Sequence, residues 1–223
     1  MSLESELDRA RELDTTELAD AIESIGFECT RCGACCKAAE TETGEDEEHT
    51  ATVFPDEIRD LQEGGEYDHR DVARPMPYGL TDGPEGPEGE TFEWALQTDG
   101  CGDCTFYAED DDGTGACTVH DDRPLICRTY PFSVAVEGSS QPMGEAVDRV
   151  GQVRAHECEG LGRDIDREDA EELAAALKRR AVRELEEAIG VRENYEPADP
   201  EPGEVVVHDS EGAKRHDGEP VDQ

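Results

Sequence analysis

The sequence is short of positive charge, of aromatic side chains and of long apolar runs. Its 223 residues include 20 Lys and Arg against 59 Asp and Glu, which gives a formal net charge of −39. Such a chain repels a phosphate backbone, so we expect no nucleic-acid partner that binds through a basic face. No apolar run approaches the ~20 residues that cross a bilayer, and the N-terminus has no secretory signal. We therefore expect a cytoplasmic protein with no membrane partner.

The composition also limits the size of the packed core, because hydrophobic residues make up 35% and aromatic residues 5% of the chain. High net charge with few aromatic residues favours disorder. It is equally typical of folded proteins that work at very high salt, where ions screen self-repulsion beyond about 3 Å at 1 M. Most of the basic residues are Arg, and the acid is spread along the whole chain. We predict a halophilic protein that contains disordered acidic segments.

Hydrophobic periodicity predicts a helix on each side of the cysteine-bearing region. Apolar residues recur at three- and four-residue intervals before Gly26, and Asp14 has the capping-box spacing to Glu17 that starts a helix. A longer apolar stripe runs through residues 166–189, and Gly190 follows it as a candidate C-cap. Helices are therefore expected to flank the cysteines.

Between these helices the chain carries short strand and turn signals. Alternating apolar residues around Trp94 and Phe132 predict strands, and the acidic, glycine-containing stretch 109–115 predicts a hairpin turn. Residues 81–90 (TDGPEGPEGE) contain no core-forming residue and predict a loop. Residues 40–50 are acidic and are expected to be mobile.

Nine cysteines are the most informative feature of the sequence. In a chain without a secretory signal, clustered CxxC spacings indicate metal binding or catalysis more often than disulfides. Cys29, Cys32 and Cys35 form a CxxCxxC segment that resembles the start of a ferredoxin cluster motif, and Gly33 permits the positive φ of a tight turn. Cys36 departs from that motif. Since adjacent side chains tend to diverge, Cys35 and Cys36 are expected to serve different irons, ions or roles.

Charge around the cysteines supports this interpretation. The chain carries no acid over 29–39 or over 123–136, although acid makes up about a quarter of its residues. A cluster of thiolates is strongly negative, and the nearby Arg31, Lys37 and Arg128 would offset that charge and lower the thiol pKa values. Burial of these stretches would exclude acid as well. The lack of acid by itself therefore fits either thiolate clusters or burial.

The remaining cysteines complete a long motif. Its elements are Cys29-x2-Cys32-Gly33-x-Cys35-Cys36, Cys104-x-Phe106, Cys117-x2-His120-x2-Arg123-Pro124-x2-Cys127-Arg128-x-Tyr130-Pro131-Phe132 and Cys158-x-Gly160. From about residue 29 to about residue 162, this pattern resembles the YkgJ-type cysteine cluster family, a zinc- or iron-chelating domain related to the cysteine-rich flagellin lysine N-methylases. The resemblance implies that the metal ligands are Cys29, Cys32, Cys35, Cys36, Cys104, Cys117, Cys127 and Cys158.

Three positions depart from the family pattern. Cys101 has no counterpart in the family, and it is either a spare thiol or a substitute ligand. His120 stands where the family is usually aromatic, and Glu159 stands where it typically has Pro. None of these changes removes a ligand that the resemblance implies.

Fold and domain organisation follow from these observations. We predict an α+β fold, with a small irregular cysteine-rich domain organised around a metal centre and flanked by helices. The expected parts are an N-terminal helical segment (1–26), the cysteine-cluster domain (27–162), a C-terminal helix packed on it (163–192) and an acidic, mostly disordered tail (193–223).

The eight implied thiols fit two tetrahedral zinc sites, or one iron–sulfur cluster with spare cysteines. The CxxCxxC start and the methylase relatives favour the iron–sulfur cluster. We therefore predict a cytoplasmic metal-binding protein whose partner is a metal ion, with any protein partner unidentified. Two alternatives remain open: an iron–sulfur enzyme related to protein lysine N-methylases, and an accessory protein that delivers metal.

Overall fold

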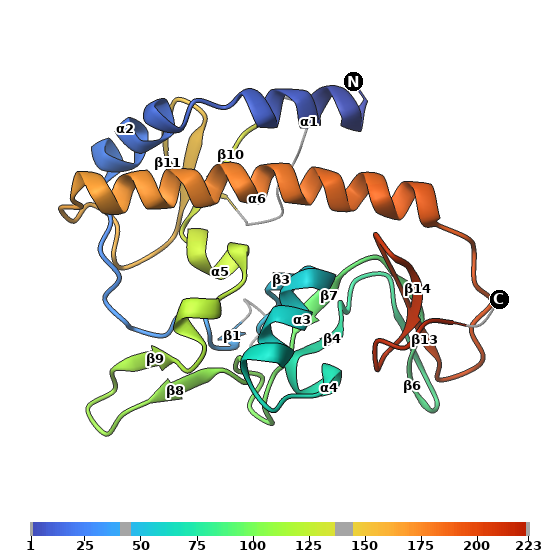
Figure 1. Ribbon diagram of the computed structural model, residues 1–223. Coiled ribbons are helices and arrows are strands. Elements are labelled where there is room, and N and C mark those ends of the chain that lie inside the picture. Colours follow the sequence, from blue (N-terminus) through green and yellow to red (C-terminus); the bar gives the residue numbers. More distant parts are fainter. Residues whose placement is uncertain (1, 41–45, 137–144, 222–223) are drawn as a thin grey trace. The chain divides into compact units, whose positions relative to one another are not determined.

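The computed structural model describes residues 2–40, 46–136 and 145–221. It mixes helices with short, mainly antiparallel strands, which confirms the predicted α+β class (Figure 1). Among the described residues, no helix is both long and apolar enough to span a membrane. The centre of the acidic stretch predicted to be mobile, residues 41–45, lies outside the described residues.

The chain divides into two compact units that interleave along the sequence. Unit one comprises Met1–Cys35, Ala108–Ala116 and Leu125–Glu186, and unit two comprises Cys36–Tyr107, Cys117–Pro124 and Glu187–Gln223. This division cuts across the predicted parts 27–162 and 163–192, and the boundary separates Cys35 from Cys36.

Unit one contains helices and one three-stranded antiparallel sheet of order β10-β12-β11. Its elements are α1 (Leu3–Glu12), α2 (Thr15–Ile25), α5 (Leu125–Thr129), β10 (Phe132–Val134), β11 (Ala146–Val150), β12 (Val153–His156) and the part of α6 (Arg167–Asn194) up to Glu186. The core is formed by fully buried side chains such as Ile22, Phe132 and Val153. Around Phe132, β10 is the strand that the alternating pattern predicted.

The predicted cap of the N-terminal helical segment is present. The Asp14 carboxylate accepts hydrogen bonds from the backbone N–H groups of Thr16 and Glu17, at 2.7 and 3.3 Å, and these bonds hold the pKa of Asp14 below its ordinary value. Gly26 ends α2 with φ +79°, a backbone conformation that is unfavourable for residues with a side chain. The predicted helical segment 1–26 thus forms two helices, α1 and α2.

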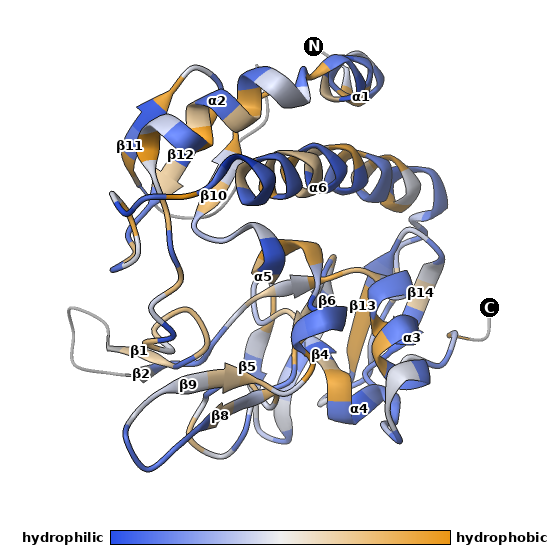
Figure 2. Cartoon of the chain, turned by 60° about the vertical axis from the view of Figure 1, so that its left-hand side comes forward, coloured by the Kyte–Doolittle hydropathy of each residue, from blue (hydrophilic) through white to orange (hydrophobic). Residues whose placement is uncertain are grey.

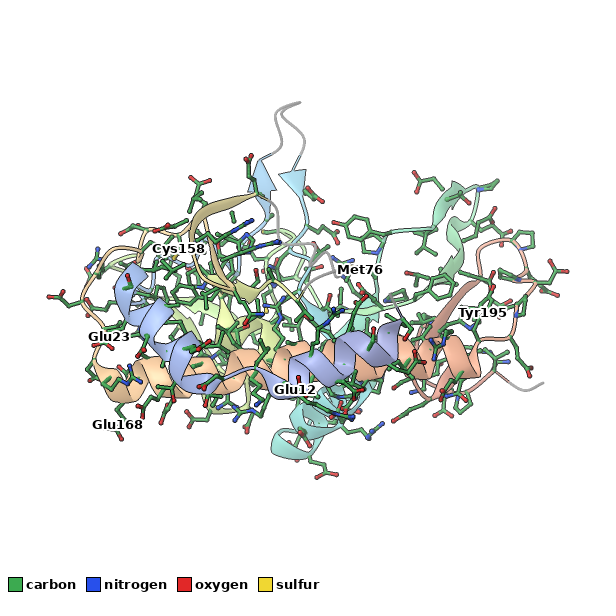
Figure 3. All side chains as sticks on the ribbon, turned by 90° about the horizontal axis from the view of Figure 1, so that it is seen from above. Glu12, Glu23, Met76, Cys158, Glu168 and Tyr195 are labelled. Atoms are coloured by element: carbon green, nitrogen blue, oxygen red, sulfur yellow. The ribbon has the colours of Figure 1, made fainter. Side chains whose placement is uncertain are left out.

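Helices α1 and α2 lie along α6, as seen from above in Figure 3. Polar contacts fix this packing at both ends of unit one. Arg167 on α6 pairs with Glu23 on α2 at 3.1 Å, and Arg11 on α1 pairs with Glu186 at 2.9 Å. Because these side chains are substantially exposed, each pair contributes at most about 1 kcal/mol, and the buried apolar stripe contributes most of the packing energy.

Helix α6 begins within one residue of the predicted start, but it does not end at Gly190. The helix continues to Asn194, so the predicted C-cap at Gly190 is wrong. A Cβ atom at Gly190 would lie 2.6 Å from the Ser210 side chain. Gly190 therefore allows two segments of unit two to pack closely. Its position near the end of the apolar stripe does not mark the end of the helix.

Unit two is built from small sheets and short helices. It contains β1 (Ala39–Glu40), β2 (Asp46–Glu47), β3 (Thr52–Val53), α3 (Pro55–Gly64), α4 (His69–Val72), β4 (Ala73–Pro75), β5 (Thr81–Gly83), β6 (Gly86–Thr91), β7 (Trp94–Leu96), η1 (His120–Asp122), β13 (Val205–Asp209) and β14 (Gly212–Arg215). Trp94 on β7 is 1% exposed, and its indole N–H donates to the Asp209 carboxylate at 2.9 Å. A buried tryptophan with a satisfied N–H thus anchors this unit.

Two segments of unit two differ from the sequence-based expectation. Residues 81–90, predicted to be a loop, form most of the β5–β6 hairpin, and β6 pairs in parallel with β13. The range 193–223, expected to be mostly disordered, carries β13 and β14 in its described part. Strand β13, which carries hydrophobic colour in Figure 2, buries Val206 and Val207. Strand β6 adds backbone hydrogen bonds without any apolar pattern of its own.

Candidate metal centre

The cysteine loop of unit one is held against the segment that carries Cys158. The Glu28 N–H donates to the Gly160 carbonyl at 3.0 Å, and Phe27 forms a β-bridge with Leu161. A Cβ atom at Gly160 would lie 2.3 Å from the Glu28 carbonyl oxygen, so only glycine fits there. These contacts place Cys29, next to Glu28, beside the segment that begins at Cys158.

The turn from Cys29 to Cys35 contains two residues in the left-handed conformation, and one residue stands between them. Arg31 has φ +59°, and Gly33 has φ +77°, the positive φ that the sequence predicted for the tight turn. The Arg31 carbonyl accepts from the Gly115 N–H at 2.7 Å, and the Arg31 side chain donates back to the Gly115 carbonyl at 3.0 Å. Arg31 therefore fixes the loop onto the hairpin of β8 (Tyr107–Glu109) and β9 (Gly115–Cys117), and this bond offsets an unfavourable backbone conformation.

That hairpin has the turn predicted at 109–115. The Asp110 carboxylate accepts from the backbone N–H groups of Thr114 at 2.8 Å and Asp112 at 3.1 Å, and these bonds close the turn. Asp110 thus has a structural role in the hairpin turn that the sequence predicted.

Four thiols of unit one lie within electrostatic reach of one another. Burial raises the pKa of Cys158, the hydrogen bond from the Gly160 N–H at 3.4 Å lowers it, and the negative charges of Cys32, Cys35 and Cys29 raise it again. Charges act on one another in this way only at short range. Thiols from both ends of the motif therefore gather in one region, and the Gly160 N–H is placed to stabilise a thiolate on Cys158.

Tyr130 connects Cys127 to the same region. Its hydroxyl donates to the Glu157 carbonyl, and burial followed by the charges of Cys158 and Cys35 raises the pKa of Tyr130 to about 12. The Tyr130 N–H continues the helical bonding of α5 to Ile126 at 3.1 Å. Tyr130 directly follows α5, three residues after Cys127.

The other four cysteines, Cys36, Cys101, Cys104 and Cys117, belong to unit two. The Cys104 N–H donates to the Cys36 carbonyl at 2.8 Å, and the Thr118 N–H, next to Cys117, donates to the Phe106 carbonyl at 2.9 Å. Cys104 is buried, whereas Cys101 is exposed. Unit two thus brings three separate cysteine-bearing segments into one hydrogen-bonded arrangement.

The chemistry of this donor set fits zinc or iron. All nine cysteines lie among the described residues, and no disulfide joins any of them. Soft thiolate ligands select zinc and iron–sulfur clusters over magnesium or calcium. Within the described ranges, however, no three Cys, His, Asp or Glu side chains stand close enough to hold an ion as they are placed. The ligand set therefore remains a prediction that rests on donor type and backbone convergence.

Other residues that the motif singled out have structural partners. His120 is exposed, with Nδ1 at 3.4 Å from Asp121, and its carbonyl accepts from the Arg123 side chain at 3.0 Å. His156 is buried, and its Nε2 lies 2.8 Å from the Ser133 hydroxyl. The buried His156 therefore has a packing role in unit one, whereas His120 is exposed in unit two.

Sequence reasoning missed one titratable group beside the cysteine loops, His49. Its N–H donates to the Gly102 carbonyl at 2.9 Å, and burial, followed by the charge of Arg74, lowers the pKa of His49 to about 4. The imidazole is thus neutral at pH 7. It follows an acidic stretch with no motif around it, so no pattern in the sequence could have identified it.

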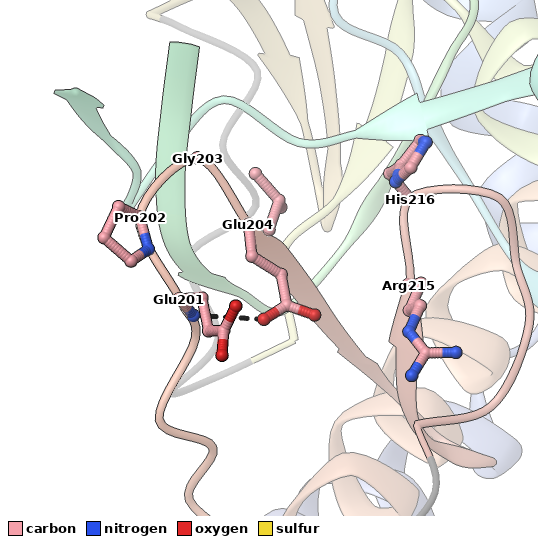
Figure 4. Close-up of a pocket in the computed structure, with 7 residues that line it drawn as sticks. Glu201, Pro202, Gly203, Glu204, Arg215 and His216 are labelled. Atoms are coloured by element: carbon pink, nitrogen blue, oxygen red, sulfur yellow. Dashed lines mark hydrogen bonds between the residues drawn. The ribbon is translucent and has the colours of Figure 1, made fainter. Parts of the chain in front are cut away.

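One cavity lies away from the cysteines. Its volume is about 730 Å³, and it lies in unit two, lined by Glu201, Pro202, Gly203, Glu204, Val205, Arg215 and His216 (Figure 4). The dashed line in the figure marks the bond from the Glu201 N–H to the Glu204 carboxylate, at 3.0 Å. None of these lining residues is a cysteine, so this cavity is not part of the thiol site.

Comparison with known proteins gives one match. A family model described as "Putative zinc- or iron-chelating domain", with the pattern CxxCxxCC, matches residues 28–159, more than half of the chain and the whole span of its cysteines. No curated protein and no solved structure matched the chain.

Proposed function

Because the chain belongs to the CxxCxxCC family of zinc- or iron-chelating domains, we propose that it is a cytoplasmic metal-binding cysteine cluster protein of a halophile. The proposed ligands are Cys29, Cys32, Cys35, Cys36, Cys104, Cys117, Cys127 and Cys158. The observation that supports the proposal best is the family match over residues 28–159, together with the backbone contacts of Phe27 and Glu28 with Leu161 and Gly160, which bring the Cys29 loop to the segment of Cys158. Metal bound there would link these segments and contribute folding energy, on the order of 10 kcal/mol for a structural site.

The residues around the thiols of unit one are suited to such a centre. The Gly160 N–H stabilises negative charge on Cys158, and no acid occurs between Cys29 and Ala39. Arg31, held by Gly115, supplies positive charge next to Cys32. Peptide N–H groups and a nearby cation are the features that favour thiolate over thiol.

Of the two metals, we favour iron, as an iron–sulfur cluster in unit one. The CxxCxxC spacing of Cys29, Cys32 and Cys35 supports this choice, because it resembles the start of a ferredoxin motif. When bound, such a cluster supplies one-electron chemistry, and the chain's own residues supply its ligands and set its exposure to solvent. Cys29 and Cys35 are exposed.

The test is anaerobic purification in molar salt, followed by iron and zinc analysis and an absorption spectrum. We expect iron with sulfide and broad absorption near about 400 nm that bleaches on reduction. Cys32→Ser should lose the iron, and Ala34→Ser, an exposed neighbour in the same loop, should keep it. A wild-type chain that contains neither iron nor zinc would refute the proposed function. Zinc in place of iron would refute only the choice of metal.

The halophilic assignment has its own test. The net charge of −39 makes the folded chain repel itself, and salt screens that repulsion. We expect the midpoint of thermal unfolding to rise steeply between about 0.1 and 1 M potassium chloride, over which the screening length falls from about 10 to about 3 Å. A midpoint that does not change with salt would contradict the assignment.

A further inference from the structure

The cavity of unit two carries charges of both signs in its lining. Figure 4 shows Glu201 and Glu204 on one side of the cavity, and Arg215 and His216 on the other. The two acids precede β13, and the two basic residues lie at the end of β14 and directly after it. Its volume of about 730 Å³ lies in the range of sites that hold small organic molecules, about 300–1,000 Å³. The cavity is therefore large enough for a small ligand.

The acidic side is held in place by backbone hydrogen bonds. The Glu204 N–H donates to the Glu201 carbonyl at 2.9 Å, and the Glu204 carboxylate accepts from the Glu201 N–H at 3.0 Å, which closes a tight turn. The Gly89 N–H on β6 donates to the Glu204 carbonyl at 3.0 Å. Gly203 has φ +79°, and a Cβ atom there would lie 2.9 Å from the Glu85 Cβ. The turn that carries both carboxylates is thus fixed against the β5–β6 hairpin.

The basic side has a fixed backbone as well. The Arg215 N–H donates to the Glu219 carbonyl at 2.8 Å, and the Gly218 N–H donates to the Arg215 carbonyl at 2.9 Å. Within the described part of the chain, no carboxylate pairs with the Arg215 guanidinium, although the chain has 59 acids to 20 Lys and Arg. The guanidinium is exposed, and it is therefore available to the carboxylate of a ligand.

The strand register sets the spacing between the opposite charges. Val206 lies opposite Arg215 in the β13–β14 pair, so Glu204 lies two residues away from that position along the chain. Diagonal neighbours of this kind in an antiparallel pair are about 7–8 Å apart. An ion pair spans about 4 Å or less between its charged atoms. The gap therefore suits a molecule whose own two charges lie close together.

A ligand with a single charge suits this lining less well. A lone anion would face the carboxylates of Glu201 and Glu204, and a lone cation would face the guanidinium of Arg215. Like charges placed together act against the wrong partner. Pro202 and Val205 add apolar surface to the lining, which favours an apolar group on the ligand. The chemistry of the cavity thus combines a positive point, a negative point and an apolar part.

We propose that this cavity binds a free α-amino acid with an apolar side chain. Arg215 binds the carboxylate of the ligand, Glu204 and Glu201 bind its ammonium group, and the side chain lies against Pro202 and Val205. The proposal goes beyond metal binding and is independent of it, because none of the described residues that line the cavity is a cysteine.

NMR of the full-length, 15N-labelled protein in about 1 M potassium chloride tests the proposal, because this salt screens the general attraction of cations to the acidic chain. L-leucine is the probe. N-acetyl-L-leucine lacks its ammonium group, and L-leucinamide lacks its carboxylate. We expect L-leucine to shift the amide resonances of Gly203 and Val205. Each of the other two compounds should bind about two- to fivefold more weakly, which corresponds to the loss of one exposed ion pair.

Single variants assign the two ion pairs. Arg215→Gln should weaken the binding of L-leucine about two- to fivefold and reduce its advantage over L-leucinamide. Glu204→Gln should instead reduce the advantage of L-leucine over N-acetyl-L-leucine, while the amide oxygen of Gln can still accept from the Glu201 N–H. Asp199→Asn is the control, because Asp199 is an exposed acid outside the lining, and it should leave all three affinities unchanged.

Three results would overturn the proposal. The first is that L-leucine shifts neither amide resonance, and the second is that either singly charged compound binds as tightly as L-leucine. The third is that Arg215→Gln binds L-leucine as tightly as the wild-type chain. The proposed metal-binding function would stand after any of these results, since iron and zinc analysis tests it separately.

Discussion

The two Cys-Gly-x-Cys loops share a backbone conformation but differ in their charge. Around Cys32 and Cys35, the neighbouring charged residue is Arg31, and acid is absent over 29–39. The loop of Cys101 and Cys104 is flanked and interrupted by Asp99 and Asp103. The Asp99 carboxylate accepts hydrogen bonds from the backbone N–H groups of Cys101 and Asp103. The Asp103 carboxylate accepts one from the backbone N–H of Ala38.

This difference shows how an acid-rich chain builds two similar turns. In unit one, the left-handed residues Arg31 and Gly33 are held by bonds to a neighbouring hairpin. In unit two, carboxylates provide the acceptors that close the loop. The absence of acid around the first loop is therefore not a feature that both turns share.

The largest expected effect is a loss of stability in one unit and not in the other when a single cysteine is replaced. Cys32→Ser should raise amide hydrogen exchange in residues 2–35 while residues 46–107 keep their protection, and Cys104→Ser should do the reverse. The reason is that metal bound by the proposed ligands of one unit would contribute folding energy, on the order of 10 kcal/mol, to that unit. Hydrogen exchange followed by mass spectrometry in molar salt gives the comparison.

Ala34→Ser provides the control for this experiment, because it alters an exposed residue of the same loop and removes no thiol. If both cysteine variants lose protection equally throughout the chain, the thiols act as one set, and the division between two units is wrong.

The next effect concerns pH and is confined to the loop of unit two. Burial lowers the pKa of His49 from 6.5 to about 4. Between these two pH values, His49 is therefore protonated in the unfolded chain and neutral in the folded chain. Stability is therefore present above pH 6.5 and is lost as the pH falls toward 4, by up to about 3 kcal/mol. His49→Gln should flatten this part of the profile.

Chemical unfolding of both proteins between pH 7 and 4.5, in molar salt, checks the expectation. Parallel profiles for the wild-type chain and His49→Gln would show that the proton on His49 does not distinguish folded from unfolded chains.

The smallest effect compares the two glycines. Gly33→Ala and Gly102→Ala should each cost about 1–2 kcal/mol, the cost of a left-handed residue with a side chain. Gly102→Ala should cost more, because its Cβ would lie 3.3 Å from the Ala38 Cβ and from the Glu48 side chain. Gly100→Ala meets nothing within 4 Å and should lie within about 0.5 kcal/mol of the wild type.

Unfolding midpoints in denaturant rank these variants. If Gly102→Ala were as stable as Gly100→Ala, the left-handed turn of the second loop would not be required.

Elements with strong local signals were predictable. The Asp14 cap, the strand around Phe132, the turn at 109–115 and the start of α6 follow from periodicity and capping chemistry, which depend on neighbours in sequence. The β5–β6 hairpin was missed because its strands bury little and depend on parallel pairing with β13, more than a hundred residues away. The backbone bonds to β13 leave no apolar pattern in the sequence of β6.

The same limit applies to the candidate site. Spacing identified the cysteines, and Gly33 has the positive φ that the spacing suggested. The sequence could not divide the cysteines between two compact units, since both units are discontinuous in the chain. It also could not identify His49, whose relevance depends on burial against Gly102 and Arg74.

X-ray absorption at the metal edge of the anaerobically purified protein tests the central claim most directly, because it reports the atoms bound to the ion. The proposed ligands predict a first shell made of sulfur alone, at about 2.3 Å for both iron and zinc. A shell dominated by nitrogen or oxygen at about 2.0–2.2 Å would contradict the account, since the ion would then be held by histidines or carboxylates and not by the cysteines.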